Sequence, residues 1–188
     1  MTSAANQRRG RSYVLRGRRI CLREVRLSDV EGPYLRWIND PEVLKYTESR
    51  FSPYSKEQLC EYITSVNENP NLVFLAITLL DSGRHIGNIK LGPIDGNHRF
   101  GDIGIIIGAK DCWGQGYATE SIRLLVDFAF ASLKLHKLTA GCYAVGTAGI
   151  RAFEKAGFTK EGIRPSQYLS DGRYVDLVYL GLVNPADV

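Results

Sequence analysis

The 188 residues carry 44% hydrophobic and 23% charged side chains and a formal net charge of +4, a composition typical of soluble globular proteins. A chain of this length is expected to form one domain that buries roughly 70% of the surface of its unfolded state. The sequence lacks an apolar run of about 18 residues, which argues against a membrane span, and its start lacks the apolar stretch of a secretory signal.

The chain begins with a strongly basic segment. A cluster of this kind can contact nucleic acid or a ribosome, but it is more often a solvated tail. We therefore predict a basic, flexible segment over residues 1–18, a single domain over residues 19–183, and neither a nucleic-acid nor a membrane partner. The arginines of the first 19 residues are Arg8, Arg9, Arg11, Arg16, Arg18 and Arg19.

The cysteines are scattered, with no Cys-x-x-Cys pair and no histidine paired with them. This spacing predicts neither a zinc site nor a disulfide framework. It favours free, mostly buried thiols in a reducing compartment, so we predict a cytoplasmic protein without a metal. The cysteines are Cys21, Cys60, Cys112 and Cys142.

The first part of the chain reads as a strand, two helices and a three-stranded meander. Residues 19–25 alternate as a strand does, and Ser28-Asp29 can cap a helix that continues through Trp37. Apolar residues on one side of 53–69 indicate a second helix. Apolar runs separated by turn residues then predict strands at 72–80, 85–91 and 103–107. The isoleucine-rich run 103–107 suits a strand covered on both faces.

A glycine-bearing turn and a long amphipathic helix follow. The turn reads Trp113-Gly114-Gln115-Gly116-Tyr117-Ala118-Thr119, and apolar residues then recur at helical spacing up to Leu133. Unpaired N–H groups and the positive end of the helix dipole favour a phosphate or pyrophosphate here. Tight turns also need glycine for geometric reasons, so the two glycines alone leave both interpretations open.

The last part of the chain completes the predicted sheet. Residues 137–143 read as a strand, 147–156 as a short helix that ends at Gly157, and 161–169 with 173–183 as a hairpin around an Asp-Gly turn. The element order predicts an α/β (α+β) fold with a mixed, mostly antiparallel sheet of about seven strands and helices on both faces.

The segment WGQGYATES resembles the acetyl-CoA-binding motif of the GNAT superfamily of N-acetyltransferases, in the form used by the RimJ/RimL type. Gly116 and Ala118 match the general pattern Q/R-x-x-G-x-G/A, and Trp113 replaces its first residue. RLSDVEGPYLRWINDPEVLKY is similar to the opening of RimJ/RimL-type proteins, and AFEKAGF to the helix beside the pantetheine arm. The resemblance covers about residues 19–183 and implies the GNAT fold, acetyl-CoA as cosubstrate and an amine as acceptor.

The resemblance also implies where the cofactor binds. The turn from Trp113 to Thr119 would hold the pyrophosphate through its amides. A backbone N–H near Ile107 or Gly108 would bind the thioester carbonyl, in a cleft where the strand 103–107 diverges from 137–143. Arg151 or Lys155 would meet the 3′-phosphate.

The sequence departs from the family at the usual catalytic positions. Phe153 stands where many relatives have a proton-donating tyrosine, and glycines stand where the family has a cofactor-orienting asparagine, a following serine and a glutamate base. The glycines are Gly146, Gly149 and Gly141. We therefore expect direct attack assisted by positioning, with Tyr143 and Asp102 as candidate catalytic groups.

Substrate contacts are expected from the early helical region and the closing hairpin. Aromatic rings with an arginine suit a peptide N-terminus, and they suit equally a nucleotide-linked amino sugar. A non-catalytic acyl-CoA-binding module remains an alternative, and a homodimer is one assembly that we consider. The candidate substrate-binding residues are Trp37, Tyr46, Arg50, Phe51 and Tyr168.

Overall fold

The computed structural model describes residues 13–188, so Arg8, Arg9 and Arg11 of the basic segment lie outside the described residues. The described part forms an eight-stranded sheet with the order β1-β2-β3-β4-β5-β6-β8-β7. All neighbouring strands are antiparallel except β5 and β6, which are parallel. The strands are β1 (Val14–Arg16), β2 (Ile20–Glu24), β3 (Val73–Leu79), β4 (His85–Asp95), β5 (Phe100–Ile107), β6 (Lys137–Tyr143), β7 (Thr159–Ser170) and β8 (Arg173–Val183).

This architecture confirms the predicted mixed, mostly antiparallel sheet and the meander of β3, β4 and β5. The additional strand is β1, which lies within the basic segment and pairs with β2 in register from Val14–Arg23 to Arg16–Cys21. Its three residues are too few to show an alternating pattern in the sequence.

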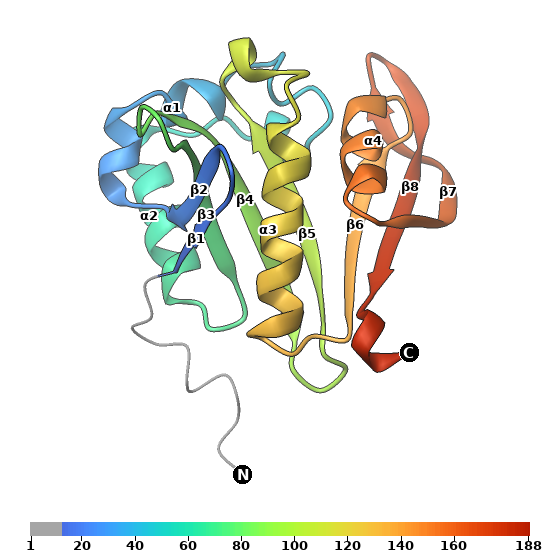
Figure 1. The fold of residues 1–188 in the computed structure, drawn as a ribbon. Helices are drawn as coiled ribbons and strands as arrows, with labels where there is room; N and C mark the ends of the chain where they lie inside the picture. The colour runs from blue at the N-terminus through green and yellow to red at the C-terminus, as the bar shows by residue number, and fades with distance from the viewer. Residues whose placement is uncertain (1–12) are drawn as a thin grey trace.

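Helices cover both faces of the sheet, as Figure 1 shows. The α-helices are α1 (Tyr34–Trp37), α2 (Lys56–Glu68), α3 (Tyr117–Ala131) and α4 (Thr147–Lys155). The 3-10 helices are η2 (Leu27–Glu31), η3 (Glu48–Phe51), η4 (Lys110–Cys112) and η5 (Pro185–Asp187). In Figure 1, α3 crosses the central strands and α4 lies beside it, in front of β6 and β8.

Each face has its own core. On one face α3 buries Ile122, Leu125 and Ala129 completely against the central strands. On the other, Leu59 and Ile63 of α2 lead a smaller cluster that packs on β3. Burial of this apolar area drives folding and fixes β5 between the two layers.

The helix predicted over residues 28–37 is broken in the structure. Residues Leu27–Glu31 form the 3-10 helix η2, and α1 adds a single turn after Pro33. Proline lacks an N–H and disfavours the α conformation of the residue before it, so Gly32-Pro33 interrupts the helix. Asp29 is buried and binds Arg23 instead of capping a continuous helix.

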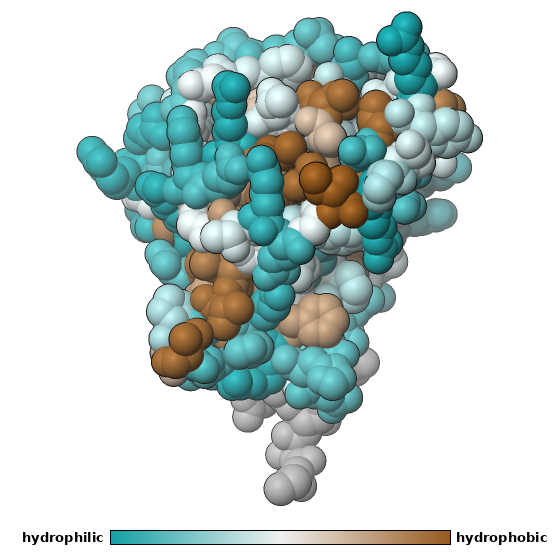
Figure 2. All heavy atoms as spheres, turned by 90° about the vertical axis from the view of Figure 1, so that its right-hand side faces the viewer, coloured by the Kyte–Doolittle hydropathy of each residue, from teal (hydrophilic) through white to brown (hydrophobic). Residues whose placement is uncertain are grey.

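The side of the molecule formed by β7 and β8 is exposed to a large extent. Figure 2 shows this side as a mostly hydrophilic surface that contains apolar areas. Exposed apolar side chains of β7 are Ile163 and Leu169, with 59% and 43% of their surface accessible. β7 is an edge strand, paired on one side only with β8.

The pair of Arg23 and Asp29 should make stability depend on acid pH. Arg23 donates two hydrogen bonds to Asp29, at 2.8 Å and 2.7 Å, and the Arg26 N–H donates a third at 2.8 Å. Burial alone would raise the pKa of Asp29, but these hydrogen bonds hold the pKa below its usual value. Because the folded-state pKa is lowered, the stabilisation is present above the unfolded value of about 3.9 and is lost as the pH falls through the folded pKa.

We expect Asp29→Asn to lower the free energy of unfolding at pH 7 by about 1–3 kcal/mol, since it weakens hydrogen bonds to a charged partner. The variant should also lose part of the acid dependence below about pH 4. Urea unfolding from pH 7 down to pH 3 measures both effects. Asp127→Asn, on the exposed side of α3, is the matched control. Equal acid dependence in Asp29→Asn and wild type would contradict this role.

Candidate active site

The turn before α3 presents a row of backbone N–H groups without partners. Gly114 and Gly116 have φ values of +73° and +83°, which side chains rarely adopt, so the path of this turn requires glycine. The helix starts with a hydrogen bond from the Glu120 N–H to the Gly116 carbonyl at 3.1 Å. Within the described part of the chain, the N–H groups of residues 114–119 donate no hydrogen bond. Such a helix end fits an anion.

Arg19 and Glu120 hold this turn against the connection between β1 and β2. Glu120 accepts hydrogen bonds from the N–H groups of Arg18 and Arg19 and from Nε of Arg19, each at 2.9 Å. Arg19 also donates to the Gln115 carbonyl at 2.9 Å and lies 4.6 Å from the Tyr117 ring centre. Burial would raise the pKa of Glu120, but the hydrogen bonds from Arg19 lower it on balance. The guanidinium adds positive charge beside the free amides.

The strands β5 and β6 separate where the sequence predicted a cleft. Their pairing ends at Asp102 and Thr139, although β5 continues to Ile107 and β6 to Tyr143. Both faces of the strand are covered as expected, because Ile105 and Ile107 pack against one core and Ile106 against the other. Ile103 is buried, but residues 105–107 are only half-buried where the cleft opens beside them.

The end of β5 directs one backbone N–H into this cleft. The Gly108 N–H donates to the Ile86 carbonyl at 2.9 Å, so it belongs to the ladder with β4. Alternate residues of an antiparallel ladder point to opposite sides, which turns the N–H and carbonyl of Ile107 toward the cleft. The Trp113 indole N–H donates to the Ile107 carbonyl at 2.7 Å. Of the two predicted donors, Ile107 therefore has the suitable orientation.

A cavity of about 940 Å³ joins the two ends of the site. One end reaches the turn before α3 and the cationic residues Arg151 and Lys155 of α4. The cleft between β5 and β6 forms the middle. The other end lies on the face of the sheet that α2 covers and contains Tyr46, Glu48 and Tyr143. This volume is in the range of pockets that hold a small molecule.

The second end of the cavity holds a cluster of tyrosines around one carboxylate. The Tyr143 hydroxyl donates to Oε1 of Glu48, and the rings of Tyr143 and Tyr168 stack with their centres 4.7 Å apart. The Tyr46 ring lies 6.2 Å from Tyr143. Burial, followed by the contact with Glu48, raises the pKa of Tyr143 to about 12. Tyr143 therefore stays a neutral donor at physiological pH.

Asp102, the other catalytic candidate, is not among the residues that line the cavity. Its carboxylate accepts a hydrogen bond from the Thr139 hydroxyl at 2.8 Å, across the last pair of β5 and β6. Burial raises the pKa of Asp102. This geometry indicates that Asp102 holds the two strands together where the cleft begins.

The predicted substrate residues divide into two groups. Tyr46 and Tyr168 line the cavity, whereas Trp37, Arg50 and Phe51 do not. Trp37 packs under Gly108 and lies 5.1 Å from the His85 ring. Arg50 donates to the carbonyls of Lys45 and Leu169 and so ties η3 to the closing hairpin. Phe51 stacks on Arg50 and keeps 60% of its surface exposed.

The positions where the sequence departs from the family all line the cavity. Phe153 is buried and packs edge-on against Phe158 at 5.1 Å, so its ring supplies contact area and no proton. Gly146 lies close to the Tyr46 ring, where a Cβ would meet ring carbon at 3.3 Å. Gly141 and Gly149 leave room in the middle of the cavity. The departures therefore widen the site.

Among the cavity residues that sequence reasoning missed, Glu48, Lys90 and Gly104 matter most for the acceptor end. Glu48 lies between the predicted Tyr46 and Arg50, and its acidic side chain among aromatic neighbours was the available signal. Lys90 and Gly104 belong to β4 and β5. The sequence pattern there predicted strands but no functional role for these two residues. Nothing in their local sequence indicates that their side of the sheet is left open.

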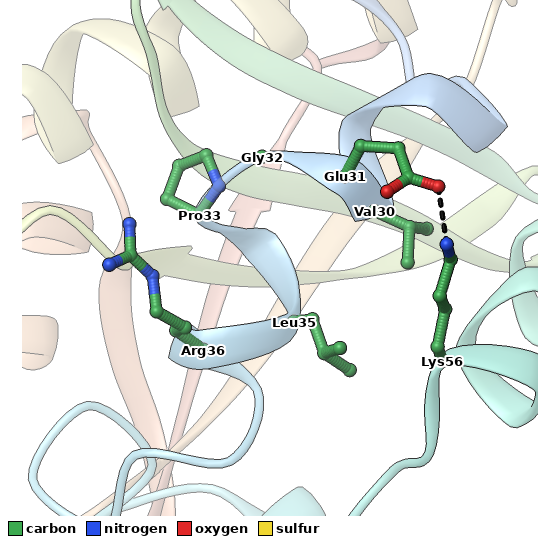
Figure 3. Close-up of a pocket in the computed structure, with 7 residues that line it drawn as sticks. All are labelled: Val30, Glu31, Gly32, Pro33, Leu35, Arg36 and Lys56. Atoms are coloured by element: carbon green, nitrogen blue, oxygen red, sulfur yellow. Dashed lines mark ion pairs between the residues drawn. The ribbon is translucent and has the colours of Figure 1, made fainter.

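A smaller hollow of about 430 Å³ lies apart, between η2, α1 and the start of α2. Figure 3 shows its lining, in which Lys56 reaches Glu31 in an ion pair at 2.5 Å while Arg36 points elsewhere. Its polar groups are exposed and it shares no residue with the large cavity. We assign it no part in the reaction.

Residues 19–159 match the family model described as the acetyltransferase (GNAT) domain. The chain belongs to the GNAT family of N-acetyltransferases. The "Probable N-acetyltransferase YjcK" of Bacillus subtilis is 31% identical, with 93% of this chain and 99% of the relative covered. The spermidine N(1)-acetyltransferase of Vibrio cholerae is 32% identical over 92 residues, which cover 49% of this chain and 53% of the relative.

Solved structures support the GNAT fold of this enzyme. A GNAT-family acetyltransferase from Bacillus anthracis superposes with a TM-score of 0.79 at 20% identity, covering 91% of this chain and 98% of that one. Spermidine N-acetyltransferase from Vibrio cholerae, in complex with CoA and spermine, also gives a TM-score of 0.79, at 24% identity with 88% and 95% covered. At this identity the likeness concerns the fold alone.

Three further findings concern residues 13–188 only. They contain no group of three or more histidine, cysteine, aspartate or glutamate side chains arranged to hold a metal ion. Their helices are too short or too polar to cross a membrane. The cysteines there are free thiols, of which Cys112 is buried and the other three are partly exposed.

Proposed function

We propose that this enzyme transfers the acetyl group of acetyl-CoA to a primary amine, on a protein N-terminus or on a small molecule, by direct attack on the thioester. The observation that carries the proposal is the continuity of one cavity. It runs from the free amides before α3, past the Ile107 N–H, to the cluster of Glu48 and Tyr143.

The residues present fit acetyl-CoA. The amides of residues 115–119 would hold the pyrophosphate, with the Arg19 guanidinium beside them. Arg151 and Lys155 line the same end of the cavity and would meet the 3′-phosphate. The pantetheine arm fits the cleft between β5 and β6. When bound, acetyl-CoA would supply the acyl carbon: a C–N bond to the neutral amine would form, the C–S bond would break, and the proton that the nitrogen then loses would go to the departing thiolate.

The chain supplies a proton acceptor and an oxyanion donor. An alkyl amine with a pKa near 10.4 arrives mostly protonated and must lose a proton before it can attack. Glu48 lies in the cavity and accepts that proton, while the neutral Tyr143 hydroxyl orients the carboxylate by its hydrogen bond. The Ile107 N–H donates to the carbonyl oxygen as negative charge develops on it.

The acceptor is a primary amine whose identity the relatives do not fix. Spermidine acetyltransferases among them favour a small molecule, whereas the RimJ/RimL-type form of WGQGYATES favours a protein N-terminus. A nucleotide-linked amino sugar is a second candidate, since aromatic rings line the acceptor end. A cytoplasmic location and the basic segment over residues 1–18 stay predictions.

The proposed function is tested by thiol release from acetyl-CoA in the presence of peptides, amino acids, polyamines and amino sugars. Turnover with at least one class of amine supports it. Binding of CoA without turnover of any amine would instead support the non-catalytic module. Mass spectrometry of the products identifies the acetylated nitrogen.

Replacement of the proton acceptor should slow the reaction in a pH-dependent way. We expect Glu48→Gln to lower kcat/KM at pH 7 by about 100-fold or more, because general base catalysis contributes on that order. The residual rate should rise with pH, following the fraction of unprotonated amine. Initial rates between pH 6 and pH 10 measure both effects.

Two variants accompany this experiment. Glu61→Gln on the exposed side of α2 should keep the wild-type rate. Tyr143→Phe should lose less activity than Glu48→Gln, because it leaves the carboxylate in place. Glu48→Gln with wild-type activity throughout the pH range would exclude Glu48 as the proton acceptor.

A further inference from the structure

We propose that Lys90 forms an anion-binding subsite in the acceptor end of the cavity, so that the preferred substrate is an amine that also carries a carboxylate or a phosphate. This inference rests on the proposed amine acetylation and names the substrate class. Its evidence lies in the strand register, in the charges around Lys90 and in the open floor of the cavity.

The register places the Lys90 side chain over the acceptor end. Lys90 of β4 lies opposite Phe74 of β3 and Gly104 of β5. Directly opposed residues in antiparallel strands share a face of the sheet, and here that is the face covered by α2. All three residues line the cavity.

Lys90 makes no close ion pair within the described part of the protein. No carboxylate of residues 13–188 lies within 4.0 Å of its ammonium group, and no hydrogen bond from it is recorded there. Beyond ion-pair distance, the positive charge of Lys90 counters the rise that burial causes in the pKa values of Asp102 and Tyr54. The carboxylates of Asp102 and Glu48 accept their hydrogen bonds from Thr139 and Tyr143 instead. By contrast, Lys45 at the rim pairs with Asp171 at 3.2 Å. A lysine left unpaired in a cavity is suited to an anionic ligand.

The floor between Lys90 and Tyr143 lacks side chains. A Cβ added to Gly104 would meet no atom within 4 Å, and one added to Gly141 would only touch Leu177 at 3.4 Å. Both glycines line the cavity between β4 and the end of β6. A compact substrate can therefore lie across them with its amine toward Glu48 and its anion toward Lys90.

The walls of this part are aromatic. Tyr54, Tyr62 and Phe74 line the cavity beside Lys90, and the Tyr62 and Phe74 rings contact each other edge-on at 5.8 Å. Apolar walls reduce the access of water, which strengthens the attraction between Lys90 and an anion. A polyamine would instead place a second ammonium group against Lys90. We therefore expect spermidine to be a poor substrate.

The test uses pairs of amines that differ only in the anion: tyrosine against tyramine for a carboxylate, and glucosamine 6-phosphate against glucosamine for a phosphate. The wild type should show a higher kcat/KM for the anionic member of at least one pair, by about 10- to 100-fold. The pair that responds identifies the anion. Lys90→Met should remove the preference, and Lys90→Arg should keep most of it.

Lys160→Met, on the exposed strand β7, serves as the matched lysine control and should leave the preference intact. An equal ratio of kcat/KM between the anionic and the neutral amine in wild type and Lys90→Met would overturn the subsite while amine acetylation stands. A wild type that prefers spermidine would do the same.

Absence of turnover with every amine would instead count against the proposed function. In that event, calorimetry with N-acetyltyrosine and N-acetylglucosamine 6-phosphate still tests the Lys90 subsite. Weaker binding of either ligand to Lys90→Met supports the subsite, and equal binding of both ligands overturns it.

Discussion

A Gly116→Trp variant is expected to lose its affinity for CoA by at least about 100-fold. Gly116 has a φ of +83°, so any side chain there strains the backbone, at a cost of about 1–2 kcal/mol. A Cβ there would lie 3.5 Å from the Arg19 guanidinium, so the indole would crowd the anion site formed by the amides of residues 117–119, which have no partners in the described structure. Hydrogen bonds to a charged group contribute about 1.5–3 kcal/mol each, so the loss of two accounts for the expected change.

Calorimetric titration with CoA measures this loss, and thermal unfolding shows whether the variant folds. The control is Gly172→Trp in the turn between β7 and β8, where φ is +76° and no atom lies within 4 Å of an added Cβ. This control suffers similar backbone strain but leaves the turn before α3 unchanged. Wild-type affinity in Gly116→Trp would place the pyrophosphate elsewhere and remove the basis of the proposed function.

The fold was predictable because its signals are local. The strand patterns, the Asp-Gly turn and the glycine stop at Gly157 each depend on a few neighbouring residues. The errors have local causes as well. Gly32-Pro33 interrupts the helix predicted over 28–37, and the three residues of β1 carry no pattern. β1 pairs locally with β2, but Tyr13 and Leu15 also pack against the core, and Tyr13 contacts Phe128 of α3, which lies far away in the sequence.

The cofactor end of the candidate site was also predictable, because one continuous segment forms it. The turn from Trp113 to Thr119 brings its own glycines and its own helix end. The acceptor end was only partly predictable. Tyr143 and Glu48 are 95 positions apart in the chain, and only the folded loop brings η3 to the end of β6. The role of Lys90 depends on an open cavity beside it, which a strand pattern does not reveal.

The end of β5 should be intolerant of a single methyl group at Gly108. A Cβ at this position would lie 2.1 Å from a ring carbon of Trp37, far inside van der Waals contact. Trp37 packs between α1 and the sheet and contacts His85, so its ring has little room to move. We expect Gly108→Ala to lower the free energy of unfolding by about 3 kcal/mol, the upper part of the usual cost of overpacking. Activity should fall by about 100-fold, because a shift of the strand end displaces the Ile107 N–H.

Gly104→Ala is the matched control for stability, since it makes the same substitution four residues earlier on β5, where a Cβ meets no atom within 4 Å. Alanine is also favoured over glycine within a strand, so this variant should be as stable as wild type or slightly more stable. Urea unfolding of both variants measures the contrast. A second change, Trp37→Leu, should restore part of the stability of Gly108→Ala by removing the ring that collides. If Gly108→Ala proves as stable as Gly104→Ala, Trp37 does not fix the end of β5, and the orientation assigned to the Ile107 N–H loses its structural support.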